Sequence, residues 1–417
     1  MYLLPKPKTI KEQDGQMLLC HSTHIVMTKE VAETEMHAAK RLQEAIRQET
    51  GLILTFSVGE VREGDLSLGI AKTLPEQTYE ITIDEKGGQI SGGDGAGVLY
   101  GVETFCQIVQ QCGGILPCVQ IQDAPDMPNR GYYFDQTRGR VLKLEELKKI
   151  ADRMCRYKLN QLQLYVEHTY LFRDFSEMWR DQTPLTAEEI LELDSYCRER
   201  HIELVPSLAS FGHLCTLLST KTYGDLCEME DSWKEPFSFW NRMRYHTINV
   251  SDERSLPLIK KMIAEYMQLF SSNKFNICAD ETFCLGKYKS KKHAEERGVH
   301  RLYIDYVKEL AQFLVENGKI PMFWGDIIWN SPELMKELPE SMICLNWGYA
   351  PEQREDETRA IAQTGAVQYL CPGVCGWNQW ANLIENSYKN ITRMCGYAAK
   401  YQGIGVLNTD WGDFGHI

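Results

Sequence analysis

The segment FNICADETFCLG, residues 275–286, passes from an apolar run directly into two adjacent acids, Asp280 and Glu281. The apolar run 275–278 has the length and composition of a buried strand. A carboxylate at the exit of such a strand would lose its hydration unless it had a partner or a task. Adjacent acids are also common on solvated surfaces, but the strand before this pair argues against that interpretation. The segment therefore predicts a strand that carries two acids to a functional edge.

Apolar runs of this kind recur from residue 130 onward, and a helical pattern follows all but the last. The runs that predict strands are YYFD, LQLYV, IELVP, FNIC, IPMFW, MICLNW, VQYL and GIGVLN. Amphipathic helices are predicted between them at 144–157, 187–200, 255–270, 300–316, 332–338, 352–363 and 383–399. Eight such repeats predict an α/β fold, the (β/α)₈ or TIM barrel. The chain ends just after the eighth strand, which indicates either a fragment or a flank covered by something else.

The first part of the chain has a different pattern. Helical spacing predicts helices at 31–49 and 96–111, and YEITIDEKGGQI predicts a hairpin that turns at Gly87 and Gly88. The segment DAPDMPNRG, rich in proline and acids, is typical of a linker. We therefore expect residues 1–126 to form a small α+β domain, with two helices packed on a sheet, and residues 127–417 to form the barrel.

Composition excludes several classes of function. The 417-residue chain has a formal net charge of −13, which argues against a nucleic-acid or anionic membrane partner. MYLLPKPKTI lacks the apolar core of a secretory signal, so a cytoplasmic protein is expected. The 14 cysteines are scattered and contain no C-x-x-C pair, which predicts free thiols and no metal site. No cofactor is expected.

In a barrel, functional side chains gather at the carboxyl ends of the strands. The residues predicted there are rich in acids and indoles: Asp135, Glu167, His213, Asp280, Glu281, Trp324, Trp347, Tyr349, Tyr369, Trp377, Trp411 and Asp413. Aromatic rings stack on the apolar faces of sugars while acids bind sugar hydroxyls, so a carbohydrate pocket is predicted. The unusually long loop 207–254 would cover it.

The adjacency of the two acids favours one mechanism. An ordinary retaining glycosidase holds its two carboxyl groups on different strands, about 5 Å apart across the anomeric carbon. Side chains of adjacent residues diverge, so one acid can reach the glycosidic oxygen while the other reaches a different substituent of the same sugar. This arrangement suits substrate-assisted hydrolysis, in which the 2-acetamido oxygen of the sugar is the nucleophile and a carboxylate orients it.

These motifs together resemble glycoside hydrolase family 20, the β-N-acetylhexosaminidases. FNICADE is similar to the fourth-strand signature of that family, and RGYYFD and KLNQLQLYVEH to its first and second strands. VPSLASFGH resembles the third-strand loop and TDWGD the eighth-strand motif. The segment from YEITIDEKGGQI onward is similar to the small domain that precedes the family's barrel. The resemblance covers nearly the whole chain and identifies a divergent branch.

The resemblance implies catalytic roles for the acid pair. Glu281 would be the general acid and then the base, and Asp280 would hold the acetamido N–H and stabilise an oxazolinium intermediate. His213 would tune Glu281 through a hydrogen bond. Glu167 follows the second strand, where the family usually has aspartates, and Ala209 replaces an acid of the third-strand motif.

The resemblance also implies a set of substrate contacts. Arg130 would bind the ring hydroxyls, and Tyr369 would donate to the acetamido oxygen, with Tyr349 as the competing candidate. The walls and outer contacts would come from the remaining predicted residues, which are Trp324, Trp347, Trp377, Trp411 and Asp413.

The implied function is a retaining exo-β-N-acetylhexosaminidase that releases terminal, non-reducing, β-linked GlcNAc or GalNAc from a glycan. One alternative is an ordinary two-carboxylate β-glycosidase, with Glu281 as the acid and Glu167 or Asp413 as its partner. Another is a catalytically silent sugar-binding barrel. The choice of sugar, the linkage and the oligomeric state stay open.

Overall fold

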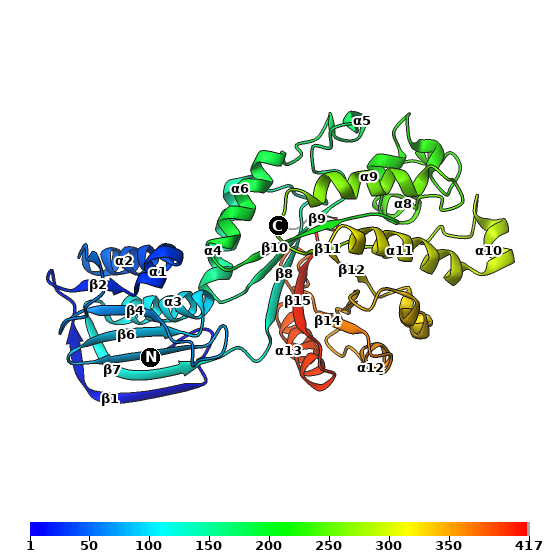
Figure 1. Ribbon diagram of the computed structural model, residues 1–417. Helices are drawn as coiled ribbons and strands as arrows, with labels where there is room; N and C mark the ends of the chain where they lie inside the picture. The colour runs from blue at the N-terminus through cyan, green and yellow to red at the C-terminus, as the bar shows by residue number, and fades with distance from the viewer. Residues whose placement is uncertain (415–417) are drawn as a thin grey trace. The chain divides into compact units, whose positions relative to one another are not determined.

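A computed structural model of the chain describes residues 1–414 and confirms the predicted barrel (Figure 1). Eight parallel strands close in the order β10-β11-β12-β13-β14-β15-β8-β9. Their bounds are β8 Asn129–Asp135, β9 Gln161–Val166, β10 Glu203–Leu208, β11 Lys274–Asn276, β12 Ile320–Trp324, β13 Ile343–Trp347, β14 Val367–Cys371 and β15 Gly405–Asp410. Every residue of β9 is buried, as expected of a parallel strand covered on both faces.

Helices connect the barrel strands, mostly where the sequence predicts them. They are α4 Leu144–Arg156, α6 Ala187–Arg198, α9 Ser255–Met267, α11 Val299–Glu316, α12 Asp356–Gln363 and α13 Ile384–Lys400. The predicted helix at 332–338 is instead the short 3₁₀ helix η4, Pro332–Glu337. Further short helices lie in the loops: α5 Ser176–Trp179, α7 Cys215–Leu218, η1 Gly224–Leu226, η2 Ser232–Lys234, α8 Phe239–Arg244, α10 Lys291–Arg297 and η3 Ile328–Asn330.

The N-terminal sheet has seven strands in the order β1-β7-β5-β6-β4-β2-β3. These are β1 Thr9–Leu18, β2 His24–Met27, β3 Thr55–Val58, β4 Leu66–Ile70, β5 Tyr79–Asp84, β6 Gly87–Gly92 and β7 Ile115–Asp123. The predicted hairpin is present, because β5 and β6 pair antiparallel, but it turns at residues 85–86, and Gly87 and Gly88 already belong to β6. This sheet and its helices bury their own apolar core.

This region has three helices rather than the two that were predicted. They are α1 Lys29–Thr34, α2 Met36–Thr50 and α3 Gly95–Cys112. The predicted helix 31–49 breaks at Glu35, whose φ of −121° is not helical. Asp94 caps α3 by accepting the Gly97 N–H at 2.8 Å.

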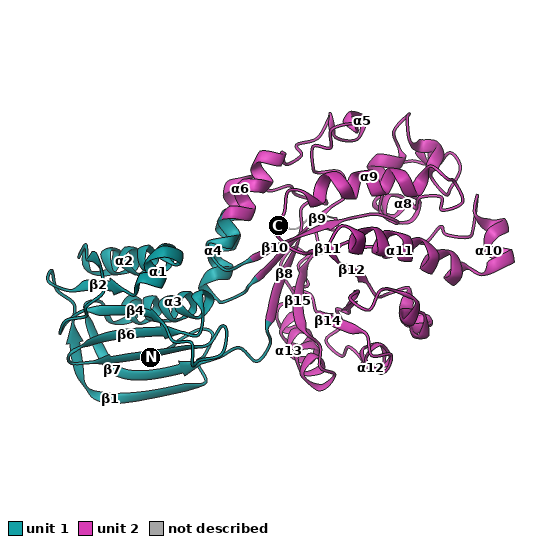
Figure 2. Ribbon diagram, viewed as in Figure 1, with its two compact units in different colours: residues 1–128, 148–160, 196–202 teal, residues 129–147, 161–195, 203–417 magenta. Residues whose placement is uncertain are grey.

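Two compact units account for the described chain (Figure 2). One comprises residues 1–128 with 148–160 and 196–202, and the other comprises the rest. Parts of α4 and α6 thus group with the first unit. The sequence prediction instead divides the chain at a single point, after residue 126. The predicted boundary itself stays a prediction.

Aromatic side chains fill the barrel below its carboxyl end. The Tyr133 ring lies 5.0 Å from those of both Trp324 and Trp411, and Tyr165 lies 5.4 Å from Trp411. These rings close the interior, which leaves the rim above them as the place for a functional site.

All 14 cysteines are free thiols, as the sequence predicts. Among residues 1–414, none of the helices combines the length and the apolar character needed to cross a bilayer.

Candidate active site

The acid pair lies just beyond β11, in a tightly turned segment. Cys278, Ala279 and Glu281 all adopt the left-handed backbone conformation, with φ of 57°, 64° and 48°. Such a conformation costs a residue with a side chain about 1–2 kcal/mol and persists only where the surroundings hold it. The backbone is therefore strained at the residues that aim the two acids.

Hydrogen bonds from neighbouring elements hold this segment in place. The Tyr303 O–H of α11 donates to the Ala279 carbonyl at 3.0 Å. The Glu281 N–H donates to Oδ2 of Asp326, beyond β12, at 3.0 Å. Since both partners come from other parts of the barrel, the direction of each acid is determined by tertiary structure.

His213, in the loop after β10, lies against both acids. Gly212 permits this approach, because a Cβ atom there would lie 2.6 Å from the Asp280 carbonyl oxygen. His213 Nε2 is 3.6 Å from Oδ2 of Asp280 and 3.4 Å from Oε2 of Glu281. Burial alone would lower the pKa of His213, but the two carboxylates raise it to about 10. His213 is thus an imidazolium at neutral pH and offsets the charge of the acids.

A pocket at the carboxyl end of the barrel contains this cluster. Its lining consists of Arg138, His213, Met243, Asp280, Glu281, Trp347, Tyr349, Trp377, Trp411 and Asp413. The structure thus brings together both predicted catalytic acids with His213, Asp413 and three of the predicted tryptophans. Trp347, Tyr349 and Trp377 form one wall, with ring centroids 5.1 Å and 5.0 Å apart along the series.

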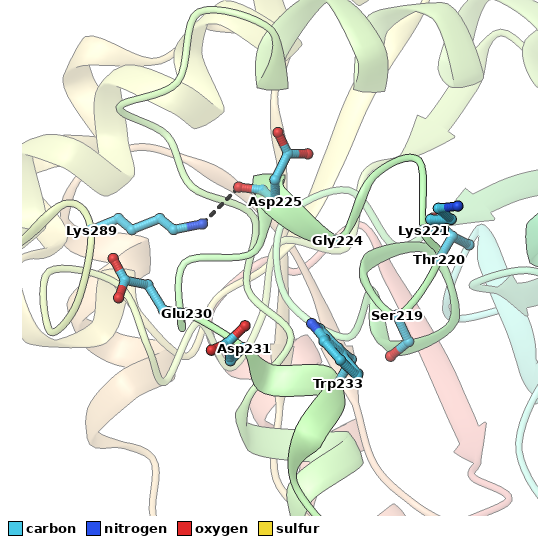
Figure 3. Close-up of a pocket in the computed structure, with 9 residues that line it drawn as sticks. All are labelled: Ser219, Thr220, Lys221, Gly224, Asp225, Glu230, Asp231, Trp233 and Lys289. Atoms are coloured by element: carbon cyan, nitrogen blue, oxygen red, sulfur yellow. Dashed lines mark hydrogen bonds between the residues drawn. The ribbon is translucent and has the colours of Figure 1, made fainter.

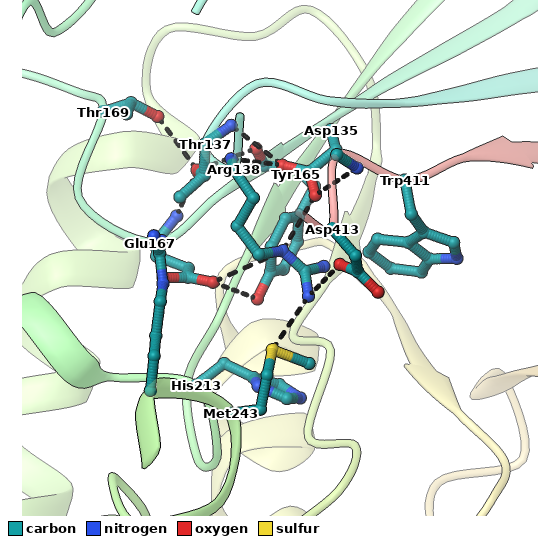
Figure 4. Close-up of polar contacts among 12 residues, drawn as sticks. Asp135, Thr137, Arg138, Tyr165, Glu167, Thr169, His213, Met243, Trp411 and Asp413 are labelled. Atoms are coloured by element: carbon teal, nitrogen blue, oxygen red, sulfur yellow. Dashed lines mark hydrogen bonds and ion pairs between the residues drawn. The ribbon is translucent and has the colours of Figure 1, made fainter. Parts of the chain in front are cut away.

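Arg138 brings a buried positive charge to the pocket (Figure 4). Its Nε lies 2.8 Å from Oδ2 of Asp135, and its Nη1 lies 2.8 Å from Oδ1 of Asp413. Glu167 Oε1 lies 3.8 Å from the same Nε. One guanidinium therefore compensates three acids, and its planar fork is fixed in direction by them.

Glu167, which the sequence places at the rim of the barrel, is part of this network and is not among the residues that line the pocket. Its Oε2 accepts from Nη2 of Arg242 at 3.0 Å. Burial opposes ionisation of the carboxyl group, but Arg242 and Arg138 lower the pKa of Glu167 to about 2. Glu167 is therefore a buried carboxylate that orients two arginines.

The prediction that Arg130 binds the sugar is wrong. Arg130 is the second residue of β8 and pairs with Val406, near the start of β15. It therefore lies toward the amino ends of the strands, whereas Asp135, at the carboxyl end of β8, lies beside the pocket. Arg138 is the arginine that the fold places there.

The choice of Tyr369 is also wrong. Its hydroxyl accepts a hydrogen bond from Nε2 of Gln161, the first residue of β9, at 3.4 Å, so it faces the opposite end of the barrel. Tyr349, the competing candidate, lines the pocket and accepts the Trp411 indole N–H at 2.7 Å.

Trp324 supports the pocket from below and does not line it. Its side chain has no exposed surface and packs against Trp411, with ring centroids 5.7 Å apart. It belongs to the aromatic layer below the pocket rather than to the lining where it was predicted.

Two lining residues have no counterpart in the sequence predictions. Arg138 follows the first barrel strand, and that position alone could have marked it. Met243 comes from α8 in the long loop after β10, and its Sδ accepts from Nη1 of Arg138 at 3.2 Å. Nothing in the sequence around Met243 marks it as a pocket residue.

A second hollow, of about 670 Å³, lies in the same long loop and is lined mainly by charged residues (Figure 3). Its charges are largely satisfied locally: Lys289 Nζ donates to the Asp225 carbonyl at 2.6 Å, and Asp231 pairs with Lys234 at 2.6 Å. None of the predicted site residues lies in it.

Comparison with known families decides the classification. Residues 128–403 match the model of the catalytic domain of glycosyl hydrolase family 20, and residues 1–124 match domain 2 of that family. The chain belongs to glycosyl hydrolase family 20. Both matches agree with the family that the sequence motifs resemble.

Relatives within family 20 include two bacterial proteins named β-hexosaminidase. The one from Porphyromonas gingivalis is 24% identical over 411 residues, which are 90% of this chain and 50% of that protein. The one from Vibrio furnissii is 26% identical over 310 residues, 67% of this chain and 48% of that protein. The chain thus spans about half the length of these relatives.

Solved structures show the same fold. A β-N-acetylhexosaminidase from Bacteroides fragilis superposes with a TM-score of 0.78 at 17% identity, covering 99% of this chain and 86% of that one. A mutant β-hexosaminidase from Streptomyces plicatus in complex with the product GlcNAc gives a TM-score of 0.80 at 19% identity, with coverages of 99% and 85%.

Loss of Arg138 is predicted to destabilise this family 20 barrel. The substitution Arg138→Gln leaves two buried acids, Asp135 and Glu167, and the half-buried Asp413 without their common partner, so the free energy of unfolding at pH 7 should fall by about 3–5 kcal/mol. Arg138→Lys, which keeps the charge, should lose less. Urea unfolding of both variants and the wild type measures the difference.

The pH dependence of that difference has a definite sign. The native pKa of Glu167, about 2, lies below its ordinary value of 4.5, so its contribution to stability is present above pH 4.5 and is lost toward pH 2. Because Arg138 supplies part of that shift, the gap between wild type and Arg138→Gln should narrow as the pH falls from 4.5. A gap that is absent at pH 7 would contradict the assignment.

Proposed function

We propose that this chain is a retaining exo-β-N-acetylhexosaminidase that releases terminal β-linked GlcNAc or GalNAc by substrate-assisted hydrolysis. The observation that carries the proposal is the placement of two adjacent acids, Asp280 and Glu281, on one strained turn in a pocket lined with indoles. The relatives named β-hexosaminidase and the fold shared with a GlcNAc complex support the substrate class.

In the first step, the acetamido oxygen of the bound sugar attacks the anomeric carbon as the glycosidic bond breaks. Glu281 donates its proton to the departing oxygen, and Asp280 accepts a hydrogen bond from the acetamido N–H, so the positive oxazolinium forms beside a carboxylate. In the second step, Glu281 takes a proton from water, whose oxygen attacks the same carbon. Two inversions give overall retention of configuration.

His213 adjusts the charge of the site for both steps. Its positive charge lies within 3.6 Å of both acids, so it offsets part of the negative charge that gathers beside the cationic intermediate.

The remaining lining residues suit a pyranose with an N-acetyl group. The tryptophan faces at Trp347, Trp377 and Trp411 offer apolar surface to the sugar ring and the acetamide methyl. Tyr349 presents a hydroxyl to the acetamido oxygen. Asp413, held by Arg138 at 2.8 Å, is placed to accept hydrogen bonds from outer sugar hydroxyls.

The ordinary two-carboxylate mechanism is less well supported. Its candidate nucleophiles, Glu167 and Asp413, are both engaged by Arg138, and Glu167 also pairs with Arg242. A carboxylate held in ion pairs is a weak nucleophile. A silent sugar-binding protein would have no use for a strained turn that aims two acids.

Hydrolysis of matched aryl glycosides tests the proposal. The enzyme should cleave an aryl N-acetyl-β-glucosaminide or N-acetyl-β-galactosaminide at least 100-fold faster, in kcat/KM, than the corresponding β-glucoside, because only the first two carry the intramolecular nucleophile, whose effect on rate is on the order of 10⁵ or more. Equal rates on all three would point to the two-carboxylate mechanism. Binding of GlcNAc by calorimetry without turnover would point to the silent protein.

The two tyrosines give a matched pair of variants. Tyr349→Phe removes the hydroxyl that faces the acetamide and should lower kcat by about 10- to 100-fold, as loss of one donor to a developing charge does. Tyr369→Phe alters the far end of the barrel and should leave kcat within about twofold of the wild type. Steady-state kinetics on the aryl N-acetyl-β-glucosaminide decides, and the reverse ranking would contradict the placement of the pocket.

A further inference from the structure

Asp326 lies beside the acid pair and has no role in the mechanism above. It follows β12, two residues beyond Trp324, and its carboxyl group is turned into the protein. Oδ2 accepts the Glu281 N–H at 3.0 Å, while Oδ1 is buried and has no hydrogen-bond partner among residues 1–414. A carboxyl group with one oxygen unpartnered in the interior needs an explanation.

The hydrogen-bond partner of Asp326 is the backbone N–H of Glu281, the residue to which the mechanism assigns the general acid. Glu281 has a φ of 48°, a conformation that a residue with a side chain adopts only where other contacts impose it. Its carbonyl accepts the Phe283 N–H at 2.7 Å, a contact within the same turn. The bond to Asp326 is the one that ties the Glu281 backbone to another strand of the barrel.

The surroundings of Asp326 keep it neutral. Burial raises the pKa of Asp326 to about 8, and Asp280 and Glu281 contribute in the same direction. Tyr303 from α11 and Cys344 from β13 also face it, and burial, with a smaller contribution from Asp326, raises the pKa of each. With a proton on one oxygen, Asp326 can accept the Glu281 N–H with the other without adding a third negative charge to the site.

We propose that Asp326 is a positioning residue for the general acid: by accepting the Glu281 N–H, it holds the Glu281 backbone in the left-handed conformation that aims the Glu281 carboxyl group into the pocket. This inference rests on the proposed function. Asp326 would thus determine where the catalytic proton of Glu281 lies, although Asp326 itself does not touch the substrate.

Two substitutions separate the acceptor from the charge. Asp326→Leu has nearly the same shape but leaves the Glu281 N–H unpartnered, whereas Asp326→Asn keeps a carbonyl oxygen that can accept it. Misplacing a general acid matters most when the leaving group needs a proton. We therefore expect Asp326→Leu to lower kcat/KM about 100-fold on a methoxyphenyl N-acetyl-β-glucosaminide but less than about 10-fold on the dinitrophenyl substrate, whose phenolate leaves unaided.

Asp326→Asn should stay within about threefold of the wild type on both substrates, because the acceptor is retained. If Asp326→Leu kept wild-type kcat/KM on the methoxyphenyl substrate, or lost activity equally on both, the inference would be overturned. So would a loss in Asp326→Asn as large as that in Asp326→Leu. A wild type inactive on every N-acetylhexosaminide would instead overturn the proposed function.

A matched control lies at the other end of the barrel. Asp194 in α6 is also buried and accepts a backbone N–H, that of Ser271 just before β11, at 3.1 Å. Asp194→Leu should lower the thermal midpoint while leaving the ratio of kcat/KM on the two substrates unchanged. The same selective loss in Asp194→Leu would show that any barrel defect produces it, which would overturn the inference.

Stability against pH gives a readout that does not depend on turnover. The native pKa of Asp326 lies above its ordinary value of 3.8, so its contribution is fully present below pH 3.8 and is lost as the pH rises toward 8. Asp326→Asn cannot ionise. The wild type should therefore lose stability relative to Asp326→Asn between pH 4 and pH 8, and a constant difference would contradict a neutral Asp326.

Discussion

The contact between one imidazolium and two adjacent carboxylates is the interaction on which this site depends. Asp280 and Glu281 leave the same strand, and their charges would repel each other in a pocket with little water. His213 lies within 3.6 Å of both and carries the compensating charge. Gly212 makes that contact possible, since any side chain there would collide with the Asp280 backbone. Without the imidazolium, no positive charge would compensate the two neighbouring acids within the pocket.

The barrel supplies the rigidity that this arrangement requires. The turn after β11 contains three residues in left-handed conformations, and partners on α11 and beyond β12 hold it. The aromatic layer of Tyr133, Tyr165, Trp324 and Trp411 closes the barrel below the pocket. Under the proposed function, this strained turn on a rigid frame would allow adjacent residues to act on different parts of one sugar. A second polar network, around Arg138, fixes the opposite side of the pocket.

Most of the barrel could be predicted because buried parallel strands leave a clear apolar signal in the sequence. LQLYV became a strand as expected, whereas FNIC did so only over its first two residues, because β11 ends at Asn276. The acid pair and His213 came together because strand ends share one rim. The α-helix predicted at 332–338 is a 3₁₀ helix instead, Pro332–Glu337, a difference that the apolar spacing alone does not resolve.

The errors within the site have a common physical cause. A motif shows that a residue is near a strand but not which end of the strand its side chain faces. Arg130 lies near the amino end of β8, and the Tyr369 hydroxyl bonds to Gln161 at that same end of the barrel. Arg138 and Tyr349 instead follow strands and line the pocket. Met243 could not be predicted as a pocket residue from the sequence. It lies in a long loop that folds over the site, and no periodic pattern in the sequence indicates that contact.

The central claim is that the sugar supplies its own nucleophile, and replacing hydrogens of the acetamide methyl with fluorine tests it most directly. Each fluorine withdraws electrons from the acetamido oxygen and makes it a weaker nucleophile without altering the leaving group. We predict that kcat/KM of the wild type falls steeply and stepwise from the N-acetyl to the N-trifluoroacetyl aryl glucosaminide. A series of equal values would show that the acetamide takes no part, and it would contradict the assignment of Asp280 and Glu281.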